Sequence, residues 1–325
     1  MIERHIKPEV AAIFIDVARG RRGIYSDDAA FEELLAEAKA AFEAADPETV
    51  EIIRQFARAE VPDGGVLFHG LTVDQDDMGE SPRDPVAFEG KDRDPVTEAA
   101  LLAFASVAGE VFSFARQHRG ALIQNVTPIP GHEYDAVGTR SRSLLDWHSE
   151  DAFDDAPQFV GLFCVRGDER VQTALAPVDR IDLSAEDEAV LRQPRFMHGI
   201  DKASGGTGRP EDGVQGAALY GEDGKRFVRI DMDCAAAVTG DDEAAAALQA
   251  FHDGADKEGI YVTLGAGDIL LFDNRRVMHA RTPFEPRYDG TDRWLQRVII
   301  TDDLGRSADR RINHPRVVEN ELVGA

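Results

Sequence analysis

The sequence has few cysteines, no long apolar run and a shortage of positive charge. Its 325 residues include two cysteines, Cys164 and Cys234, and neither lies in a CxxC pattern. This excludes a disulfide scaffold and a cysteine-rich metal site, so we expect two buried thiols. No segment approaches the roughly 18 apolar residues of a membrane span, and the first residues lack the long apolar stretch of a signal peptide. We therefore expect a cytoplasmic protein that does not bind membranes.

The charge balance narrows the possible partners. The chain has 36 Lys and Arg against 61 Asp and Glu, a formal net charge of −25. A protein that binds nucleic acid through a cationic surface is therefore excluded. With 43% hydrophobic and 30% charged residues, the chain can bury a sizeable core. Any anionic ligand must then be held by arginines placed locally within a negatively charged protein.

The first third of the chain has a mainly helical pattern. Apolar residues recur at helical spacing between 31 and 42, and a second short helix is expected after the proline that follows. The glycine-flanked run 65–71 predicts a buried strand, and the Asp-, Pro- and Gly-rich stretch 74–95 predicts a surface loop. The segment 97–117 predicts a long helix, with Thr97 as its N-cap.

From residue 121 the pattern changes to short apolar runs separated by turn residues, which is typical of strands. Helical patterns interrupt these runs at 184–193 and 241–255, and 201–216 has the composition of a lid-like loop. Many short strands with glycine-rich turns favour a barrel or jelly roll with helices packed outside it. We therefore expect an α+β fold with a mainly β core, a cupin-like jelly roll.

No repeat or clear linker divides the chain, which favours a single domain over residues 1–325. Within it we expect a mainly helical flank over 1–120, a jelly-roll core with helical insertions over 121–301, and a C-terminal tail over 302–325.

Of nine histidines, one has an acidic residue two positions later: His148, with Glu150, in LLDWHSED. Residues i and i+2 of a strand share one face, so this pair can bind one metal ion from a strand end. In so acidic a sequence, more than one such pair is expected by chance. An exposed pair at the end of a strand therefore remains an alternative.

His279 gives the pair more weight. It follows a short apolar strand and an Asp-Asn turn in ILLFDNRRVMHAR, the arrangement needed to bring a third ligand across a barrel. Two histidines and one carboxylate on one face of an ion form the facial triad of non-haem Fe(II) oxygenases. Zinc accepts the same ligands, so a zinc hydrolase remains an alternative.

Arg293 and Arg297 in RWLQRVIIT favour the oxygenase. On a strand the two would point into the barrel together, and buried guanidinium groups need anionic partners. Their forked geometry suits carboxylates, so two inward arginines imply two carboxylates, either internal or supplied by ligands. Two surface arginines on an edge strand are the alternative.

These motifs resemble the clavaminate synthase-like branch of the Fe(II)/2-oxoglutarate-dependent dioxygenases, over roughly 121–301. The resemblance implies a double-stranded β-helix and an amino-acid hydroxylase that uses Fe(II), 2-oxoglutarate and O2. It implies His148, Glu150 and His279 as the iron ligands at the catalytic centre. Arg293 would bind the distal carboxylate of 2-oxoglutarate, and Thr173 would supply a hydroxyl to it.

The resemblance also suggests a substrate. Arg297 would hold the α-carboxylate of a free amino acid, and Gln124 would lie near its α-amino group. Asp231 and Asp233 lie two positions apart in the strand-like run VRIDMDC, so we expect them to share a face, where two carboxylates repel unless a cation lies between them. An acidic surface strand is the alternative. Arginine β-hydroxylases are similar to this sequence at both positions, whereas the asparagine enzyme is similar at the second alone.

We therefore expect hydroxylation of L-arginine, or a close cationic analogue, at C3. Alternatives are C4 hydroxylation, desaturation, or a different amino acid such as lysine, citrulline or asparagine. A further alternative is a cupin-like binding protein without turnover.

Overall fold

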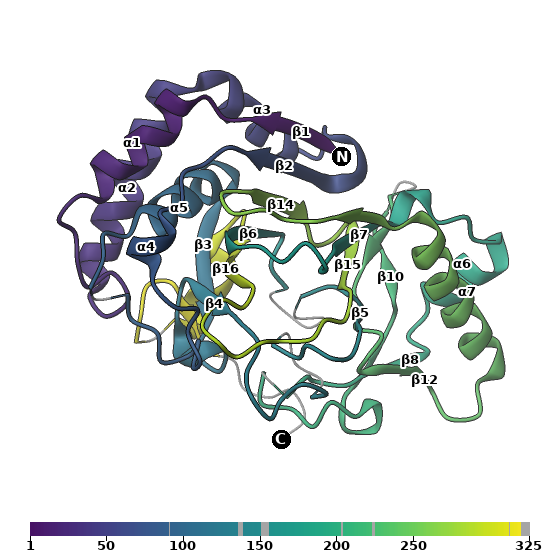
Figure 1. Cartoon of the computed structure of the whole chain (residues 1–325). Coiled ribbons are helices and arrows are strands. Elements are labelled where there is room, and N and C mark those ends of the chain that lie inside the picture. Colours follow the sequence, from purple (N-terminus) through teal and green to yellow (C-terminus); the bar gives the residue numbers. More distant parts are fainter. Residues whose placement is uncertain are drawn as a thin grey trace.

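The computed structural model describes residues 1–90, 92–135, 139–150, 156–202, 204–222, 225–311 and 313–319. Their strands form two main sheets (Figure 1). The larger sheet has the order β1-β2-β14-β6-β16-β3-β17, with β4 paired to β16. Its strands are β1 (Ile2–His5), β2 (Gly65–His69), β3 (Glu110–Phe114), β4 (Gln124–Val126), β6 (Phe159–Arg166), β14 (Ile269–Asp273), β16 (Trp294–Thr301) and β17 (Val317–Val318).

The smaller main sheet has the order β13-β7-β15-β5. Its strands are β5 (Leu145–His148), β7 (Thr173–Pro177), β13 (Ile260–Val262) and β15 (Val277–Arg281). Two minor sheets, β12-β8-β9 and β10-β11, extend the molecule beyond it. They contain β8 (Phe196–His198), β9 (Val214–Gly216), β10 (Leu219–Tyr220), β11 (Phe227–Val228) and β12 (Ala235–Ala237).

Side chains of both main sheets meet in one apolar cluster, so the sheets face each other as in a jelly roll. Leu162 of β6, Leu295 of β16 and Leu175 of β7 belong to this cluster. Their neighbours Ala174 and Ala176 on β7 join a different cluster on the outer face. This alternation follows from the two-residue period of a strand. The expected mainly β core and jelly-roll fold are confirmed.

Helices cover the outer faces of both sheets (Figure 1). The N-terminal helices pack on the larger sheet, and α6 and α7 pack on the smaller one. The helices are α1 (Pro8–Ala18), α2 (Asp28–Ala45), α3 (Pro47–Ala57), α4 (Gln75–Met78), α5 (Val96–Ala108), α6 (Ala185–Leu191) and α7 (Asp242–Glu258). Among the residues described, no helix combines the length and the apolar composition that crossing a membrane requires.

The helices expected near 31–42, after Pro47, at 184–193 and at 241–255 are confirmed. The long helix expected over 97–117 is wrong in its second half: α5 ends at Ala108, and the chain continues as β3. Gly109 lies against the backbone of Thr301, where a Cβ atom would meet the carbonyl oxygen at 2.4 Å. The chain can therefore turn there into a strand that pairs with β16.

Two other local expectations are also wrong. Thr97 lies inside α5, whose N-cap is Pro95. Asp231 and Asp233 do not lie on a regular strand: Asp231 makes an isolated bridge to His148, and Asp233 lies in the turn that follows. The Asp233 backbone N–H donates to the Asp231 carboxylate at 2.9 Å, and this local bond competes with strand pairing.

A buried carboxylate of α5, Glu98, connects this helix to β16. Glu98 is fully buried and accepts hydrogen bonds from Arg93, from the Tyr25 hydroxyl at 2.8 Å and from the Gln296 amide at 2.7 Å. Burial raises the pKa of Glu98, but the Arg93 guanidinium and these hydrogen bonds outweigh burial and bring it below its ordinary value. The carboxylate is therefore ionised in the folded protein at neutral pH.

We expect Glu98→Gln to lower the free energy of unfolding by about 3–5 kcal/mol, because it leaves the Arg93 guanidinium buried without a counter-ion. Since the folded-state pKa is lowered, Glu98 stabilises the fold above its unfolded-state pKa, and this contribution is lost as pH falls through the folded-state pKa. The difference between wild type and variant in urea unfolding should therefore shrink in acid. Glu51→Gln, which removes a surface ion pair with Arg58, should change stability little, and equal losses in both variants would contradict the argument.

Candidate active site

The site is built around the tripeptide 148–150, whose first residue is the last residue of β5. His148 is the last residue of β5, and it lies opposite His279 of β15 in the ladder between these strands. The Nδ1 atom of His148 lies 2.7 Å from the Asp146 carbonyl oxygen, to which it can only donate. This fixes the tautomer and leaves Nε2 of His148 free to bind a metal.

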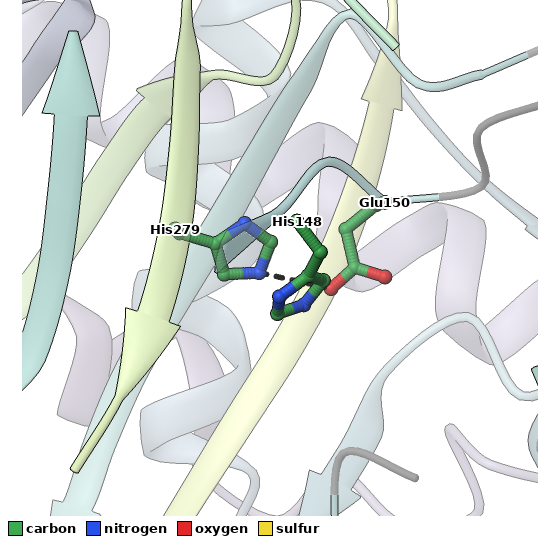
Figure 2. Close-up of side chains that lie close together, drawn as sticks. All are labelled: His148, Glu150 and His279. Atoms are coloured by element: carbon green, nitrogen blue, oxygen red, sulfur yellow. Dashed lines mark ion pairs between the residues drawn. The ribbon is translucent and has the colours of Figure 1, made fainter. Parts of the chain in front are cut away.

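The side chains of His148, Glu150 and His279 point towards one another (Figure 2). Their potential ligand atoms all lie within 4.8 Å of one another, and Nε2 of His279 is 3.5 Å from a Glu150 carboxylate oxygen. Among the residues that the structure describes, this is the one such cluster found. The three side chains could hold one metal ion, as the sequence predicted.

Neighbouring segments hold this tripeptide on both sides. Asn274, in the turn between β14 and β15, accepts from the Glu150 backbone N–H at 2.8 Å and donates to its carbonyl oxygen at 3.0 Å. On the other side, Ser149 donates its backbone N–H to the Ile230 carbonyl at 2.7 Å, which brings Asp231 beside His148. Residues 148–150 therefore connect the cluster of possible metal ligands to the segment that carries Asp231.

The electrostatics of the cluster match the protonation states of metal ligands. Burial raises the pKa of Glu150, but the Arg297 guanidinium, aided by the histidines, outweighs burial and holds it well below its ordinary value. Burial, together with repulsion from His148, lowers the pKa of His279 to about 4. At neutral pH the site thus offers an ionised carboxylate and an uncharged imidazole, the forms that bind metals.

The cluster opens into a cavity of about 410 Å³. This volume is sufficient for a small ligand. The cavity brings together eight of the nine site residues predicted from the sequence: His148, Glu150, Thr173, Asp231, Asp233, His279, Arg293 and Arg297. Gln124 does not line the cavity; it is buried behind Arg297.

Arg293 is a buried cation with a single neutral partner. Its side chain is 7% exposed and donates to the Thr173 hydroxyl at 3.0 Å. No carboxylate of the described segments lies within 4 Å of its guanidinium. Burial lowers its pKa. A buried guanidinium without a counter-ion is unfavourable, so this wall of the cavity is suited to a ligand carboxylate.

Arg297 connects the cluster of possible metal ligands to β4. It forms an ion pair with Glu150, and its Nε donates to the Gln124 amide oxygen at 3.0 Å. The sequence placed Arg297 inside the barrel but gave no sign that it pairs with Glu150.

Asp231 and Asp233 both face the cavity, but their partners differ. Asp233 forms an ion pair with Arg140 and accepts from the Asp146 backbone N–H at 3.2 Å. Asp231 has no cationic side chain within 4 Å in the described part of the chain. Burial and the neighbouring carboxylates, moderated by His148, raise its pKa. A ligand cation would relieve this repulsion.

The sequence analysis missed three charged residues at this end of the cavity: Arg140, Asp201 and Arg281. Asp201 and Arg281 line the cavity. Burial, with repulsion from Arg293 and Arg140, lowers the pKa of Arg281 to about 9. Its position two residues after His279 could have revealed it, because i and i+2 share a strand face. Arg140 lies in a loop, where no periodicity marks its direction.

Three comparisons relate the chain to known proteins. Residues 213–299 match the model of the family described as taurine catabolism dioxygenase TauD, TfdA family. Over 287 residues the chain is 31% identical to the enduracididine beta-hydroxylase of Streptomyces hygroscopicus, covering 78% of this chain and 82% of the relative.

Two solved proteins share the fold over nearly the whole chain. The structure of asparagine oxygenase with Fe(II), 2S,3S-3-hydroxyasparagine and succinate has a TM-score of 0.87 and 28% identity, covering 99% of this chain and 100% of that one. The non-heme iron oxygenase OrfP has a TM-score of 0.85 and 29% identity, covering 98% and 100%. OrfP was solved with Fe and alpha-ketoglutaric acid, and also with Fe, succinate and (3S)-hydroxy-L-Arg.

We expect His279→Ala to weaken binding of Fe(II) or Co(II) by more than about 100-fold, because it removes a ligand atom rather than its support. Asn274→Ala should weaken metal binding by about 10-fold, since the Glu150 backbone loses both bonds that hold it. Anaerobic titration followed by absorbance would measure both effects. His5→Ala, at an exposed position, is the control, and metal affinity unchanged in His279→Ala would rule out this centre.

Proposed function

The chain belongs to the Fe(II)- and 2-oxoglutarate-dependent amino-acid hydroxylases of the TauD/TfdA family, and we propose that it hydroxylates L-arginine, or a close cationic analogue, at C3. Bound iron and 2-oxoglutarate supply the oxidising chemistry, in which O2 and 2-oxoglutarate yield succinate and CO2 while one oxygen atom enters a substrate C–H bond. The protein's own residues bind and orient the reactants.

In this proposal His148, Glu150 and His279 hold the iron. The fit rests on the convergence of their ligand atoms and on the hydrogen bond that leaves Nε2 of His148 available. Two histidines and a carboxylate leave the remaining positions of the ion open to 2-oxoglutarate and O2.

Arg293 and Thr173 hold the distal carboxylate of 2-oxoglutarate. Arg293 is a buried cation that faces the cavity, and its partner among the described residues is a neutral hydroxyl. A bidentate carboxylate would supply the missing counter-charge, and the Thr173 hydroxyl can donate to the same group.

Arg297 holds the α-carboxylate of the amino acid. Its guanidinium reaches the cavity beside Glu150, and the Gln124 amide oxygen fixes its orientation from behind. Gln124 therefore acts on the substrate's α-carbon end through Arg297. Once Glu150 binds the metal, the guanidinium can share its donors with the substrate carboxylate.

Asp231 carries the choice of substrate. It faces the same cavity as Arg297, and no cation of the described residues compensates it. A ligand that satisfies both residues must carry a carboxylate at one end and a cation at the other, which describes a basic amino acid. The two Asp233 contacts fall on Oδ2, and its Oδ1 has no partner among the described residues. A guanidinium is favoured over an ammonium because it can donate to two acceptors in one plane.

With both ends held, the middle of the substrate chain is presented to the metal, and we assign the reaction to C3. A shift of about one bond would give C4 hydroxylation or desaturation. Lysine satisfies the charge with a less suitable geometry, and citrulline or asparagine leaves Asp231 without a counter-ion.

The test is to incubate the Fe(II)-loaded protein with 2-oxoglutarate, ascorbate and O2, offering single amino acids and following succinate and product by mass spectrometry and NMR. We expect arginine to gain one oxygen at C3, in step with succinate. Asp231→Asn should lower kcat/KM for arginine by about 100-fold, because the substrate cation loses its uncompensated partner. Preferred oxidation of a neutral amino acid would keep the enzyme class and contradict the substrate assignment.

A second variant tests the cosubstrate site. Thr173→Val keeps the shape of the side chain and removes the hydroxyl, so we expect KM for 2-oxoglutarate to rise by about 10-fold while KM for the amino acid changes little. Steady-state kinetics with each reactant varied in turn would measure this. A rise in both KM values would indicate a distorted barrel rather than a lost contact.

A further inference from the structure

An internal ion pair lies beside the proposed cation site. Arg140 is 5% exposed, and its guanidinium pairs with Asp233. Because Asp233 faces the cavity and Arg140 does not line it, the guanidinium lies on the far side of the carboxylate from the ligand space. Part of the negative charge presented to a ligand is thus compensated by the protein itself.

The strand that carries His279 holds Arg140 in place. Arg281, two residues further along β15, donates to the backbone carbonyls of Arg140 and Ser141, the latter at 3.2 Å. Arg281 has carbonyl oxygens as its partners, and no carboxylate of the described residues lies within 4 Å of it. The Arg140 backbone is therefore fixed to the metal-binding strand, and a substrate cannot displace its side chain without leaving a buried cation unpaired.

The charges at this end of the cavity can be counted. Asp231 and Asp233 both face the ligand space, and Arg140 pairs with Asp233, whereas no cation of the described residues lies within 4 Å of Asp231. The Asp201 carboxylate accepts from the Ser204 backbone N–H at 2.7 Å and from its hydroxyl at 3.0 Å, so its partners are neutral. Of the pair Asp231 and Asp233, one carboxylate is thus left for a positive charge on a ligand to balance.

We propose that Arg140 is a specificity-determining residue: by neutralising Asp233 it leaves the pair Asp231 and Asp233 with one uncompensated negative charge and so selects amino acids with a singly positive side chain. The inference rests on the proposed function and adds a residue that acts on the substrate through Asp233. Arg140 thus affects how strongly the protein prefers a charged substrate side chain over a neutral one of the same shape.

Arginine and citrulline provide the measurement, because they are nearly identical in shape and differ by one charge. The readout is the ratio of their kcat/KM values. Arg140→Gln adds an uncompensated negative charge and should raise this ratio in favour of arginine by about 10-fold or more. Asp233→Asn leaves Arg140 uncompensated and should lower the ratio by a similar factor. In the double variant the two changes cancel, and the ratio should return to within about 3-fold of wild type.

Two further variants separate charge from structure. Arg140→Lys keeps the charge and should keep the ratio close to wild type. Arg142→Gln removes the same charge from an exposed position, where Arg142 pairs with Glu285, and should leave the ratio unchanged. If Arg140→Gln does not fold, Asp233→Asn still tests the charge balance, because it retains Arg140 and the bonds of its backbone to Arg281.

The outcomes distinguish this proposal from the function on which it rests. A ratio that is unchanged in both single variants, or an equal loss from Asp233→Asn with and without Arg140, would overturn the role of Arg140 while wild-type arginine hydroxylation stands. A wild-type protein that oxidises neither arginine nor citrulline, yet couples succinate to another amino acid, would overturn the proposed substrate and with it this inference.

Discussion

The alternation of side chains along β16 is the constraint on which the site depends. Leu295 and Ile299 face the space between the sheets, while Val298 and Ile300 face the helical layer. Arg297 shares the inner face, and Gln296 points outward to Glu98 of α5. A slip of one residue would place the guanidinium in the helical core and an apolar side chain in the cavity. The pairing of β16 with β6 and β4 therefore fixes the register and the chemistry together.

The second constraint is the compensation of buried charge. The barrel keeps Arg281 and Arg293 away from water with hydroxyl and carbonyl partners, and Asp231 has no cation within 4 Å among the residues that the structure describes. Each arrangement is unfavourable by itself, because a buried charge lacks a counter-ion. In the proposed function, the 2-oxoglutarate carboxylate compensates Arg293 and the substrate cation compensates Asp231. Affinity for such ligands thus arises from groups that the protein leaves unsatisfied.

The sequence predicted most of the features that lie on regular strands. Arg297 was predicted from a period-two pattern and His279 from its position after an apolar strand and a turn, and the apolar runs beside them mark the strands to which they belong. His148 and Glu150 followed from the same reasoning, although Glu150 lies just beyond its strand. What these residues share is a direction set by the backbone ladder, which a sequence pattern can reveal.

The features that the sequence did not predict depend on turns and on neighbours distant in the chain. The end of α5 at Ala108 depends on the backbone approach between Gly109 and Thr301, and no local signal within 97–117 outweighs its helical pattern. Asp231 and Asp233 reach the cavity through a turn stabilised by their own hydrogen bond rather than through strand alternation. The direction of Arg140 depends on the distant Arg281, which anchors its backbone.

Residues held by strands and residues held by loops can vary differently in this site. Residues 148–150 are hydrogen-bonded through Ser149 to Ile230 and through Glu150 to Asn274. The cluster of possible metal ligands and the Asp231 turn are therefore held together. Arg140 and Asp201 approach this unit from loops, and their side chains contribute charge without forming part of the strand ladder. Substitutions in those loops can therefore change the charge facing the cavity while the arrangement of His148, Glu150 and His279 stays fixed. In the proposed function, the affinity for iron thus depends on residues held by the strands, and the choice of amino acid depends in part on residues in the loops.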